Sequence, residues 1–342
     1  MVDEHGQDLK LIGEYLVDTE RADAIVKGTF KFVNDHQVPN KLFGRILASP
    51  YAHAKILSID TSKAEALEGV EAVITYEDNE AWSDDGEMLC WGQEFAAVAA
   101  VDENTAERAL LLIEVDWDIL PFNITAEDAL KPGAPLTGTF EESNVGSPST
   151  WSRGDVEAGL AEATHVVEAT HGWGRPHTQN TVESEGAIAW WEGEDVYGYD
   201  RNQNPHSNNR SNASNLGVPL NRCHFKVIGA GGGFGGGGQT REPTTAALLS
   251  KKAGKPVQIT RPRRIQSPSR RNHYGPRLSM KLGWNEDTQT MTALECIWYT
   301  WGGRNGSRGG YNQNIDTTFM CDNILYESYG VATNTGYGAG YR

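Results

Sequence analysis

The most informative stretch of this sequence is VIGAGGGFGGGGQTRE, from Val227 to Glu242. Eight of the ten positions from Gly229 to Gly238 are glycine, and one large aromatic, Phe234, stands among them. A flexible linker would combine glycine with serine and would have no use for that aromatic. The composition therefore indicates a backbone that approaches a ligand closely. The other interpretation is a glycine-rich turn that only packs.

The segments on both sides of the glycines are predicted to be ordered. Residues 223–228 are rich in β-forming side chains and predict a strand, and residues 255–261 predict a second one. Residues 240–254 predict a helix, with Pro243 in its first turn and Gly254 as its stop signal. A strand, a glycine loop and a helix N-terminus together form an anion site from backbone N–H groups and the helix dipole. We therefore expect an anion to bind at this loop.

Two phosphate-binding motifs nearly match the loop, and both fail on chemistry. Residues 231–236 fit the dinucleotide pattern GxGxxG, but that pattern needs an acid roughly 20 residues further on. No acid occurs between Glu242 and Glu286. Residues 233–240 resemble a P-loop in which Gln239 replaces the phosphate-binding lysine. Neither a dinucleotide nor a nucleoside triphosphate is therefore expected here.

Composition restricts the class of protein. The chain has 342 residues, enough for two or more domains, and a formal net charge of -16, which argues against a nucleic-acid or anionic-membrane partner. No apolar run is long enough to cross a bilayer, and residues 1–10 lack the basic and apolar regions of a secretory signal. The four cysteines form no C-x-x-C pair, so neither a zinc site nor an iron–sulfur cluster is evident. We expect a cytoplasmic protein with reduced, partly buried thiols.

Two domains are predicted along the chain. In residues 18–131 short strands alternate with short helices, which is typical of a compact α+β domain, and Asp102 is predicted to cap one of the helices. Residues 132–163 begin with a stretch rich in Gly, Pro, Ser and Thr and are predicted to be a linker. Long strands and glycine-rich loops follow in residues 164–342, which are expected to form the second domain.

Five stretches, in the same order along the chain, are similar to one protein family. They are residues 42–78, 92–121, 165–199, 231–236 and 333–342. Together they resemble the molybdopterin-binding subunit of the molybdenum hydroxylases, the xanthine dehydrogenase and aldehyde oxidase group. The resemblance covers nearly the whole chain and implies an α+β protein. Its parts are an a/b hammerhead-like domain over residues 18–131 and, after the linker, the first half of a molybdenum cofactor-binding α/β domain over residues 164–342.

The resemblance implies a site as well as a fold. The family's cofactor is molybdenum–molybdopterin, as such or as its cytosine dinucleotide, and Phe234 and Gly235 match the residues that face the metal. Gly233, Gly236 and Arg342 match other cofactor-binding positions. No residue of this chain is expected to ligate the metal directly. Backbone N–H groups suit such a loop because they stabilise negative charge without ionising.

Two departures from the family pattern affect the site. Gly237 and Gly238 stand where the family commonly has a lysine and an acid. Counting back from Glu183, the family often has a glutamine six residues earlier, near the apical metal ligand, and a histidine four residues earlier. This chain has them exchanged, with His177 in the first place and Gln179 in the second. Both are candidate catalytic residues: a glutamine amide donates to an oxo ligand directly, and a histidine does so only in some protonation states.

The resemblance also implies partners. The family's molybdopterin subunit is longer, and its second half supplies further cofactor-binding loops and a catalytic glutamate. We therefore expect this chain to be the N-terminal half of a split subunit that shares its cofactor with a second molybdopterin-binding half. An iron–sulfur subunit and a flavin (FAD) subunit are expected to complete the enzyme. The chain end is expected to lie in a subunit interface, without which its tyrosines would be in water: Tyr326, Tyr329, Tyr337 and Tyr341.

Three functions follow from the resemblance. The favoured one is oxidation of an organic substrate, cyclic or heteroaromatic, with water as the oxygen source. The second is a molybdenum-dependent hydratase without net redox change, which the missing lysine and acid and the exchanged His177 and Gln179 keep open. The third is a non-catalytic subunit that retains the fold.

Two further features have simpler interpretations. His53 is expected to have a structural role at a turn or strand end. Five arginines in residues 261–271 are expected to form a solvated face, with contact to the acidic surface of a partner or to a pterin phosphate as the alternatives.

Overall fold

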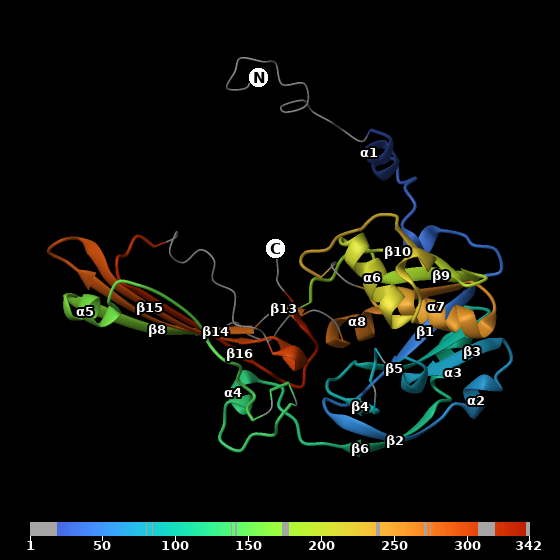
Figure 1. Ribbon diagram of the computed structural model, residues 1–342, viewed down its shortest axis with the longest axis horizontal. Helices are drawn as coiled ribbons and strands as arrows, with labels where there is room; N and C mark the ends of the chain where they lie inside the picture. Colours follow the sequence, from blue (N-terminus) through green and yellow to red (C-terminus); the bar gives the residue numbers. More distant parts are fainter. Residues whose placement is uncertain are drawn as a thin grey trace, which may run out of the picture.

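The structure is a computed structural model of the chain. It describes residues 19–79, 81–83, 85–137, 139–140, 142–172, 178–236, 240–269, 272–273, 275–306 and 319–339. A seven-stranded sheet with helices against it forms the main body, and a five-stranded sheet extends from it to one side (Figure 1). Helices and strands both contribute to the fold, which confirms the predicted α+β class.

The seven-stranded sheet joins the two predicted domains. From edge to edge its strands are β11 (Cys223–Val227), β10 (Asp195–Asp200), β9 (Gly186–Glu192), β12 (Val257–Thr260), β1 (Leu42–Ala48), β5 (Glu94–Ala100) and β3 (Val70–Thr75). β1 pairs in parallel with β12 and antiparallel with β5. A strand of the second domain therefore lies directly beside a strand of the first. The two strands predicted on either side of the glycine loop are β11 and β12, and both lie in this sheet.

Helix α7 (Glu242–Ala253) follows the glycine loop and packs against the sheet beside helix α6 (Pro205–Asn215) (Figure 1). Ala246 and Ala247 are fully buried, and their small side chains let the helix lie close to the strands. The helix ends at Gly254, whose φ of +66° is the left-handed conformation that glycine adopts without strain. The predicted helix and its stop signal are confirmed.

A three-stranded sheet and two helices complete the N-terminal part. The strands are β4 (Glu87–Met88), β2 (Ala54–Asp60) and β6 (Glu114–Ile119), and the helices are α2 (Ser62–Glu65) and α3 (Glu103–Leu110). The Asp102 carboxylate accepts a hydrogen bond from the Thr105 backbone N–H at 2.8 Å, so the predicted helix cap is confirmed. Met88 and Phe95 lie in the core of this part, almost completely buried.

The five-stranded sheet carries a small core of its own. Its strands, in order, are β7 (Ser149–Arg153), β16 (Ile324–Val331), β15 (Thr290–Trp301), β14 (Gly275–Asn285) and β8 (His165–Gly172), and helix α5 (Val156–Ala161) lies at its far end (Figure 1). Leu294, Cys296 and Ile324 are fully buried there. β7 and α5 fall within residues 132–163, so the predicted linker contains regular structure. The domain boundaries themselves remain predictions.

The remaining elements are short. They are α1 (Thr19–Val26), η1 (Val33–Asp35), η2 (Tyr76–Asp78), α4 (Ala126–Ala129), η3 (Leu220–Arg222), α8 (Arg263–Ser269), β13 (Asn272–His273), η4 (Gly303–Asn305) and β17 (Gly338–Ala339). Within the described ranges no helix combines the length and apolarity needed to span a membrane. The four cysteines are buried free thiols, as expected, and burial raises the pKa of Cys90 to about 11.

Candidate cofactor-binding site

The glycine loop leaves the sheet after β11 and leads into α7, and its backbone is strained. Gly232 and Gly235 have φ of +110° and +96°, a region that residues with side chains rarely adopt. Phe234 also has a positive φ, +50°, which is unusual for a bulky residue, and its side chain is 48% exposed. Strained backbone of this kind persists where the surrounding structure enforces it, often at binding sites. The loop therefore displays an aromatic ring on an enforced backbone.

Polar side chains press against this loop at three glycines. A Cβ added to Gly233 would lie 2.5 Å from Oε1 of Gln203, and a Cβ on Gly236 would lie 2.9 Å from Oε1 of Gln179. Real Cβ atoms do not approach other atoms so closely, and Gly231 is similarly confined by Glu183. The glycines are thus required for packing within the chain. These contacts support the packing interpretation of the stretch, and close approach to a ligand stays a prediction.

Gln179 is the predicted site residue that the structure places most informatively. It is only 7% exposed, its amide lies against Gly236, and its Nε2 has no hydrogen-bond partner among the described residues. A buried donor left without an acceptor costs about 1–3 kcal/mol, so such groups usually await a ligand or water. The structure brings Gln179 together with the loop residues Gly233–Gly236. The other predicted site residues, His177 and Arg342, lie outside the described residues.

An ion pair that the sequence did not reveal holds the start of the loop. Arg201 is 1% exposed, and its Nε lies 3.2 Å from Oε2 of Glu183. The same carboxylate oxygen accepts the backbone N–H of Gly231 at 2.6 Å, and Arg201 Nη2 donates to the carbonyl of Gly232. The signal for these residues is the polar run that follows β10 directly, at the strand end nearest the loop.

The N-terminus of α7 differs from the expected anion site. The Arg241 backbone N–H donates to Oε2 of Glu242 at 3.1 Å, so the chain's own carboxylate takes a donor at this helix end. Glu242 is fully buried and paired with Arg261 at 2.6 Å. This one N–H is therefore not offered to an external anion, because an internal acid with a buried counterion accepts it, and anion binding at the loop stays a prediction.

Arg261 is the centre of a buried charge cluster. Its side chain is fully buried and pairs with Glu94 of β5, with Glu242 of α7 and, at 3.4 Å, with Glu185. Burial acts to lower the pKa of the Arg261 guanidinium, but the three carboxylates outweigh it and raise the pKa above its ordinary value. This cluster ties the first predicted domain to the glycine-loop end of the second.

The basic segment after β12 departs from the solvated face expected for residues 261–271 at Arg261 alone. Arg263 and Arg264 are exposed, and Arg270 and Arg271 lie outside the described residues. Arg261 is buried, whereas Arg263 donates to the carbonyls of Thr181 and Val182 and Arg264 pairs with Glu107. Each of these three cations is engaged within the chain. Sequence reasoning failed here because the acids that neutralise Arg261 are distant in sequence.

Without a partner, the tyrosines near the chain end are expected to be exposed to water. The described ones are instead engaged within the chain. Tyr326 is 2% exposed, and Tyr329 stacks on Tyr299 with ring centroids 5.0 Å apart. The hydroxyl of Tyr337 accepts hydrogen bonds from Arg304 and, at 2.8 Å, from Arg241.

Burial alone would raise the pKa of Tyr337, but the charges of Arg241 and Arg304 lower it below its ordinary value. Tyr341 lies outside the described residues. The described tyrosines are thus buried, stacked or bonded within the chain, and they supply no argument for an interface.

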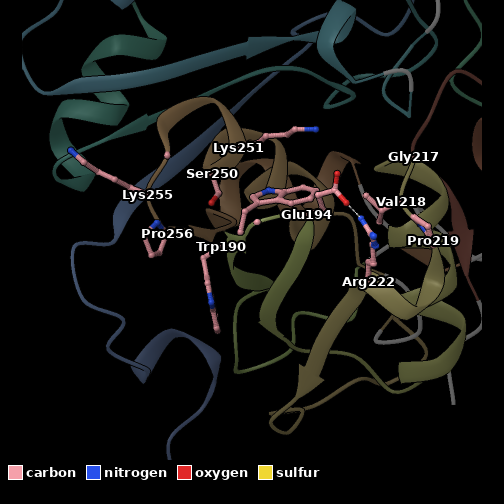
Figure 2. A pocket seen from close by; sticks show the side chains of 13 residues that line it. Trp190, Glu194, Gly217, Val218, Pro219, Arg222, Ser250, Lys251, Lys255 and Pro256 are labelled. Atoms are coloured by element: carbon pink, nitrogen blue, oxygen red, sulfur yellow. Dashed lines mark hydrogen bonds and ion pairs between the residues drawn. The ribbon is translucent and has the colours of Figure 1, made fainter.

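A cavity of about 540 Å³ lies away from the loop, with Trp190, Glu194 and Arg222 among its lining residues (Figure 2). Its walls include Ser250 and Lys251 near the last turn of α7, whereas the glycine loop precedes the first turn. A helix of 12 residues spans about 18 Å, so the cavity and the loop are at opposite ends of α7. The cavity therefore does not coincide with the predicted cofactor-binding loop.

Several polar groups around this cavity already have partners. Trp191 Nε1 donates to the carbonyl of Ala247 at 2.8 Å, and Arg222 pairs with Glu194, as Figure 2 shows. Lys255, at the edge, pairs with Glu71 at 2.8 Å.

His53 has the structural role expected of it. Its Nδ1 lies 2.7 Å from the carbonyl oxygen of Pro121 and its Nε2 lies 2.7 Å from Oε1 of Glu87, and the side chain is buried. It thus ties β4 to the segment that follows β6 rather than facing a ligand. Over the part of the chain that the structure describes, no cluster of three or more His, Cys, Asp or Glu side chains could hold a metal ion.

Comparison with protein families identifies both parts of the chain. Residues 139–342 match the molybdopterin cofactor-binding domain, and residues 27–121 match the a/b hammerhead domain of aldehyde oxidase and xanthine dehydrogenase. The predicted order, a hammerhead domain followed by a molybdopterin-binding domain, is confirmed.

Individual relatives agree with these matches. A probable xanthine dehydrogenase subunit of Bacillus subtilis is 33% identical over 75% of this chain, and the nicotinate dehydrogenase large molybdopterin subunit of Eubacterium barkeri is 25% identical over 98%. The crystal structure of quinoline 2-oxidoreductase from Pseudomonas putida 86 superposes with a TM-score of 0.84, at 25% identity over 94% of this chain.

The chain corresponds to only part of most of these proteins. It spans 36% of the Bacillus protein and 44% of the quinoline enzyme's chain, but 82% of the Eubacterium subunit. The family matches cover both parts of the fold, including the glycine loop and Gln179 beside it. The chain therefore belongs to the xanthine dehydrogenase and aldehyde oxidase family, as a molybdopterin-binding subunit.

Proposed function

We propose that the glycine loop binds molybdenum–molybdopterin and that the chain takes part in oxidising an organic substrate, with water as the oxygen source. The observation that carries the proposal is the buried Nε2 of Gln179, a donor beside Gly236 for which the described part of the chain supplies no acceptor. The loop also suits the cofactor, because its glycines leave the backbone accessible and its enforced conformation is present before any ligand binds.

The residues of this chain have distinct roles in the proposal. When bound, the molybdenum centre supplies the two-electron oxidation. Residues 233–235 provide backbone N–H groups at its surface, whereas the Gly236 N–H already donates to the Gly233 carbonyl at 2.7 Å. Gln179 Nε2 donates a hydrogen bond to one of its acceptor atoms. Phe234, exposed and held by a strained backbone, lies where it can shape the approach of a flat substrate. His177 and Arg342 remain candidate site residues.

Gln179 is the better candidate donor of the exchanged pair on chemical grounds. Its amide donates at any pH, whereas His177 needs a particular tautomer or a proton. A catalytic contact through Gln179 therefore adds no titration of its own to the pH dependence of the reaction.

The relatives favour a heteroaromatic substrate. Nicotinate and quinoline are both nitrogen heteroaromatic compounds, and the proteins named after them match 98% and 94% of this chain. These relatives are named as a dehydrogenase and an oxidoreductase, and no observation favours the hydratase or the non-catalytic alternative.

The proposal includes partner subunits. The high coverage of the Eubacterium large molybdopterin subunit supports a split arrangement, in which a second molybdopterin-binding half completes the site. An iron–sulfur subunit and a flavin subunit would carry the electrons away. Whether the cofactor is a cytosine dinucleotide can be determined by releasing it and analysing the nucleotide.

The experiment is to purify the chain with its partners from cells that make molybdopterin. The complex is then assayed with nitrogen heteroaromatic substrates, an artificial electron acceptor and ¹⁸O-labelled water. We expect bound molybdenum, substrate-dependent reduction of the acceptor and label in the product. Labelled product without acceptor reduction would establish the hydratase instead, and a complex lacking both molybdenum and turnover would establish a non-catalytic subunit.

A further inference from the structure

Two consecutive residues at the end of β10 contact the two ends of the glycine loop. Arg201 donates to the carbonyl of Gly232 and pairs with the carboxylate that receives the Gly231 N–H. Asp200 accepts the hydroxyl of Thr240, the first described residue beyond the loop, at 2.9 Å. One dipeptide thus reaches both the entry and the exit of the loop.

The exit contact is part of a buried cluster. The Thr240 backbone N–H donates to Oδ1 of Asn208 at 3.3 Å, and Asn208 Nδ2 donates to Thr240 Oγ1 at 3.1 Å and to Asp200. Asp200, Asn208 and Thr240 are each at most 5% exposed. Hydrogen bonds that are shielded from water in this way are costly to break, because the separated groups remain buried.

The Asp200 carboxylate accepts hydrogen bonds from four donors. It receives the backbone N–H of Arg201 at 2.7 Å, the side-chain amides of Asn202 and Asn208, and the hydroxyl of Thr240. The Arg201 guanidinium is directed elsewhere, to Glu183 and the loop. The two residues therefore share no ion pair, and each is committed to its own end of the loop.

We propose that Asp200 and Arg201 are positioning residues that clamp the exit and the entry of the glycine loop, so that the backbone from Gly232 to Gly236 keeps one shape for the cofactor. The identity of that ligand rests on the proposed function. The clamp itself is a property of the folded chain and can be measured without cofactor.

The test breaks the exit contact at Thr240 in the full-length chain. Thr240→Val removes the hydroxyl, Thr240→Ser retains it, and Thr240→Ala removes it without placing a methyl group against Asp200. Thr244→Val is the matched control. Thr244, which lies in α7, is also buried, but its hydroxyl donates to Oδ1 of Asn212 at 3.2 Å and not to Asp200. Hydrogen exchange of the loop amides, measured by mass spectrometry on cofactor-free protein, reports the shape of the loop.

We expect loop amides in Thr240→Val and Thr240→Ala to exchange about tenfold faster than in the wild type, the change expected for losing a bond to a charged group. Thr240→Ser and Thr244→Val should retain wild-type exchange in the loop. Unchanged exchange in both hydroxyl-deleted variants, or an equal increase in the Thr244 control, would overturn the clamp.

Molybdenum content of the assembled complex is the second readout. The proposal predicts less molybdenum per chain in the two hydroxyl-deleted variants, with recovery in Thr240→Ser. A loosened loop with full molybdenum content would overturn the positioning role. If the wild-type complex holds no molybdenum, the proposed function fails, and the exchange data still decide whether the clamp exists.

Discussion

The two ends of helix α7 differ in whether they offer a cavity and in whether their polar groups are hydrogen-bonded. Beyond its last turn lies a cavity of about 540 Å³, where the Trp191 indole and the Arg222 guanidinium are already bonded within the chain. Before its first turn lies the glycine loop, where the buried Nε2 of Gln179 has no acceptor within the described ranges. The cavity thus lies at the C-terminal end of α7, and the unpaired amide lies at its N-terminal end.

The difference shows which of these observations better indicates a ligand. A surface depression with satisfied groups costs nothing to leave to water, whereas a buried donor without an acceptor costs about 1–3 kcal/mol. The chain tolerates that cost beside Gly236, on a loop with an enforced backbone. Function is therefore expected at the glycine-loop end, and the following predictions test that contrast.

The largest effect is expected for Arg261→Met, which removes the cation from the charge cluster at the loop end of α7. Three carboxylates, Glu94, Glu185 and Glu242, would remain buried around an apolar side chain. We expect the free energy of unfolding to fall by about 3–5 kcal/mol in denaturant titrations. Lys63→Met, which breaks an exposed pair with Glu114, is the control and should leave the free energy of unfolding near the wild-type value, because water screens such a pair. Equal effects would mean that the cluster contributes no more than a surface pair.

Gln179→Leu is expected to weaken cofactor binding without lowering the stability of the cofactor-free chain. Because the variant removes an unmet donor, the cofactor-free chain should be as stable as the wild type or more stable by about 1–3 kcal/mol. Its molybdenum content in the complex should nevertheless fall. Thermal unfolding and metal analysis of the same preparations provide both values. A cofactor-free variant that loses stability would show that the amide has an internal role.

The buried carboxyl of Asp200 should make the loop end sensitive to pH. Burial, with a further contribution from the charge of Glu242, raises the pKa of Asp200 from 3.8 to about 6, against the bonds from Asn202 and Thr240. A raised pKa in the folded state means that the stabilising contribution is complete below about pH 3.8 and is lost as the pH rises through 6.

Lowering the pH from 7 to 5 should therefore raise the free energy of unfolding of the wild type, relative to that of Asp200→Asn, by roughly 1 kcal/mol. Denaturant titrations at both values measure it. A difference independent of pH would show that the four donors around Asp200 keep it ionised throughout this range.

The smallest effect is expected at the cavity end. Arg222→Gln breaks an exposed ion pair with Glu194 in the cavity wall, and such pairs contribute about 0–1 kcal/mol. Stability, molybdenum content and turnover should all remain near the wild-type values. A loss of turnover without a loss of stability would indicate that the cavity, too, binds a functional ligand.

Local structure near the loop could be predicted because its signals are local. The β-forming residues of β11, the proline and glycine that bracket α7 and the cap at Asp102 each act within a few residues. The glycine stretch likewise indicated a close approach before any contact was known.

The contacts that hold the loop could not be predicted because they join distant parts of the chain. Asp200 and Thr240 are separated by 40 residues in sequence, and Arg261 and Glu94 by 167. Nothing in the local pattern of residues 261–271 distinguishes a buried arginine from a solvated one. The shared sheet, in which β1 lies between β12 and β5, had no local signal either.

The most direct test of the central claim compares one variant from each end of α7. Gly235 has a φ of +96°, so Gly235→Val strains the loop backbone and places a branched side chain on it. Arg222→Gln changes the cavity end alone. Molybdenum and pterin are quantified per chain in purified complexes of the wild type and both variants. The account predicts that Gly235→Val loses both while Arg222→Gln retains both; a Gly235→Val complex with full molybdenum and pterin would contradict it.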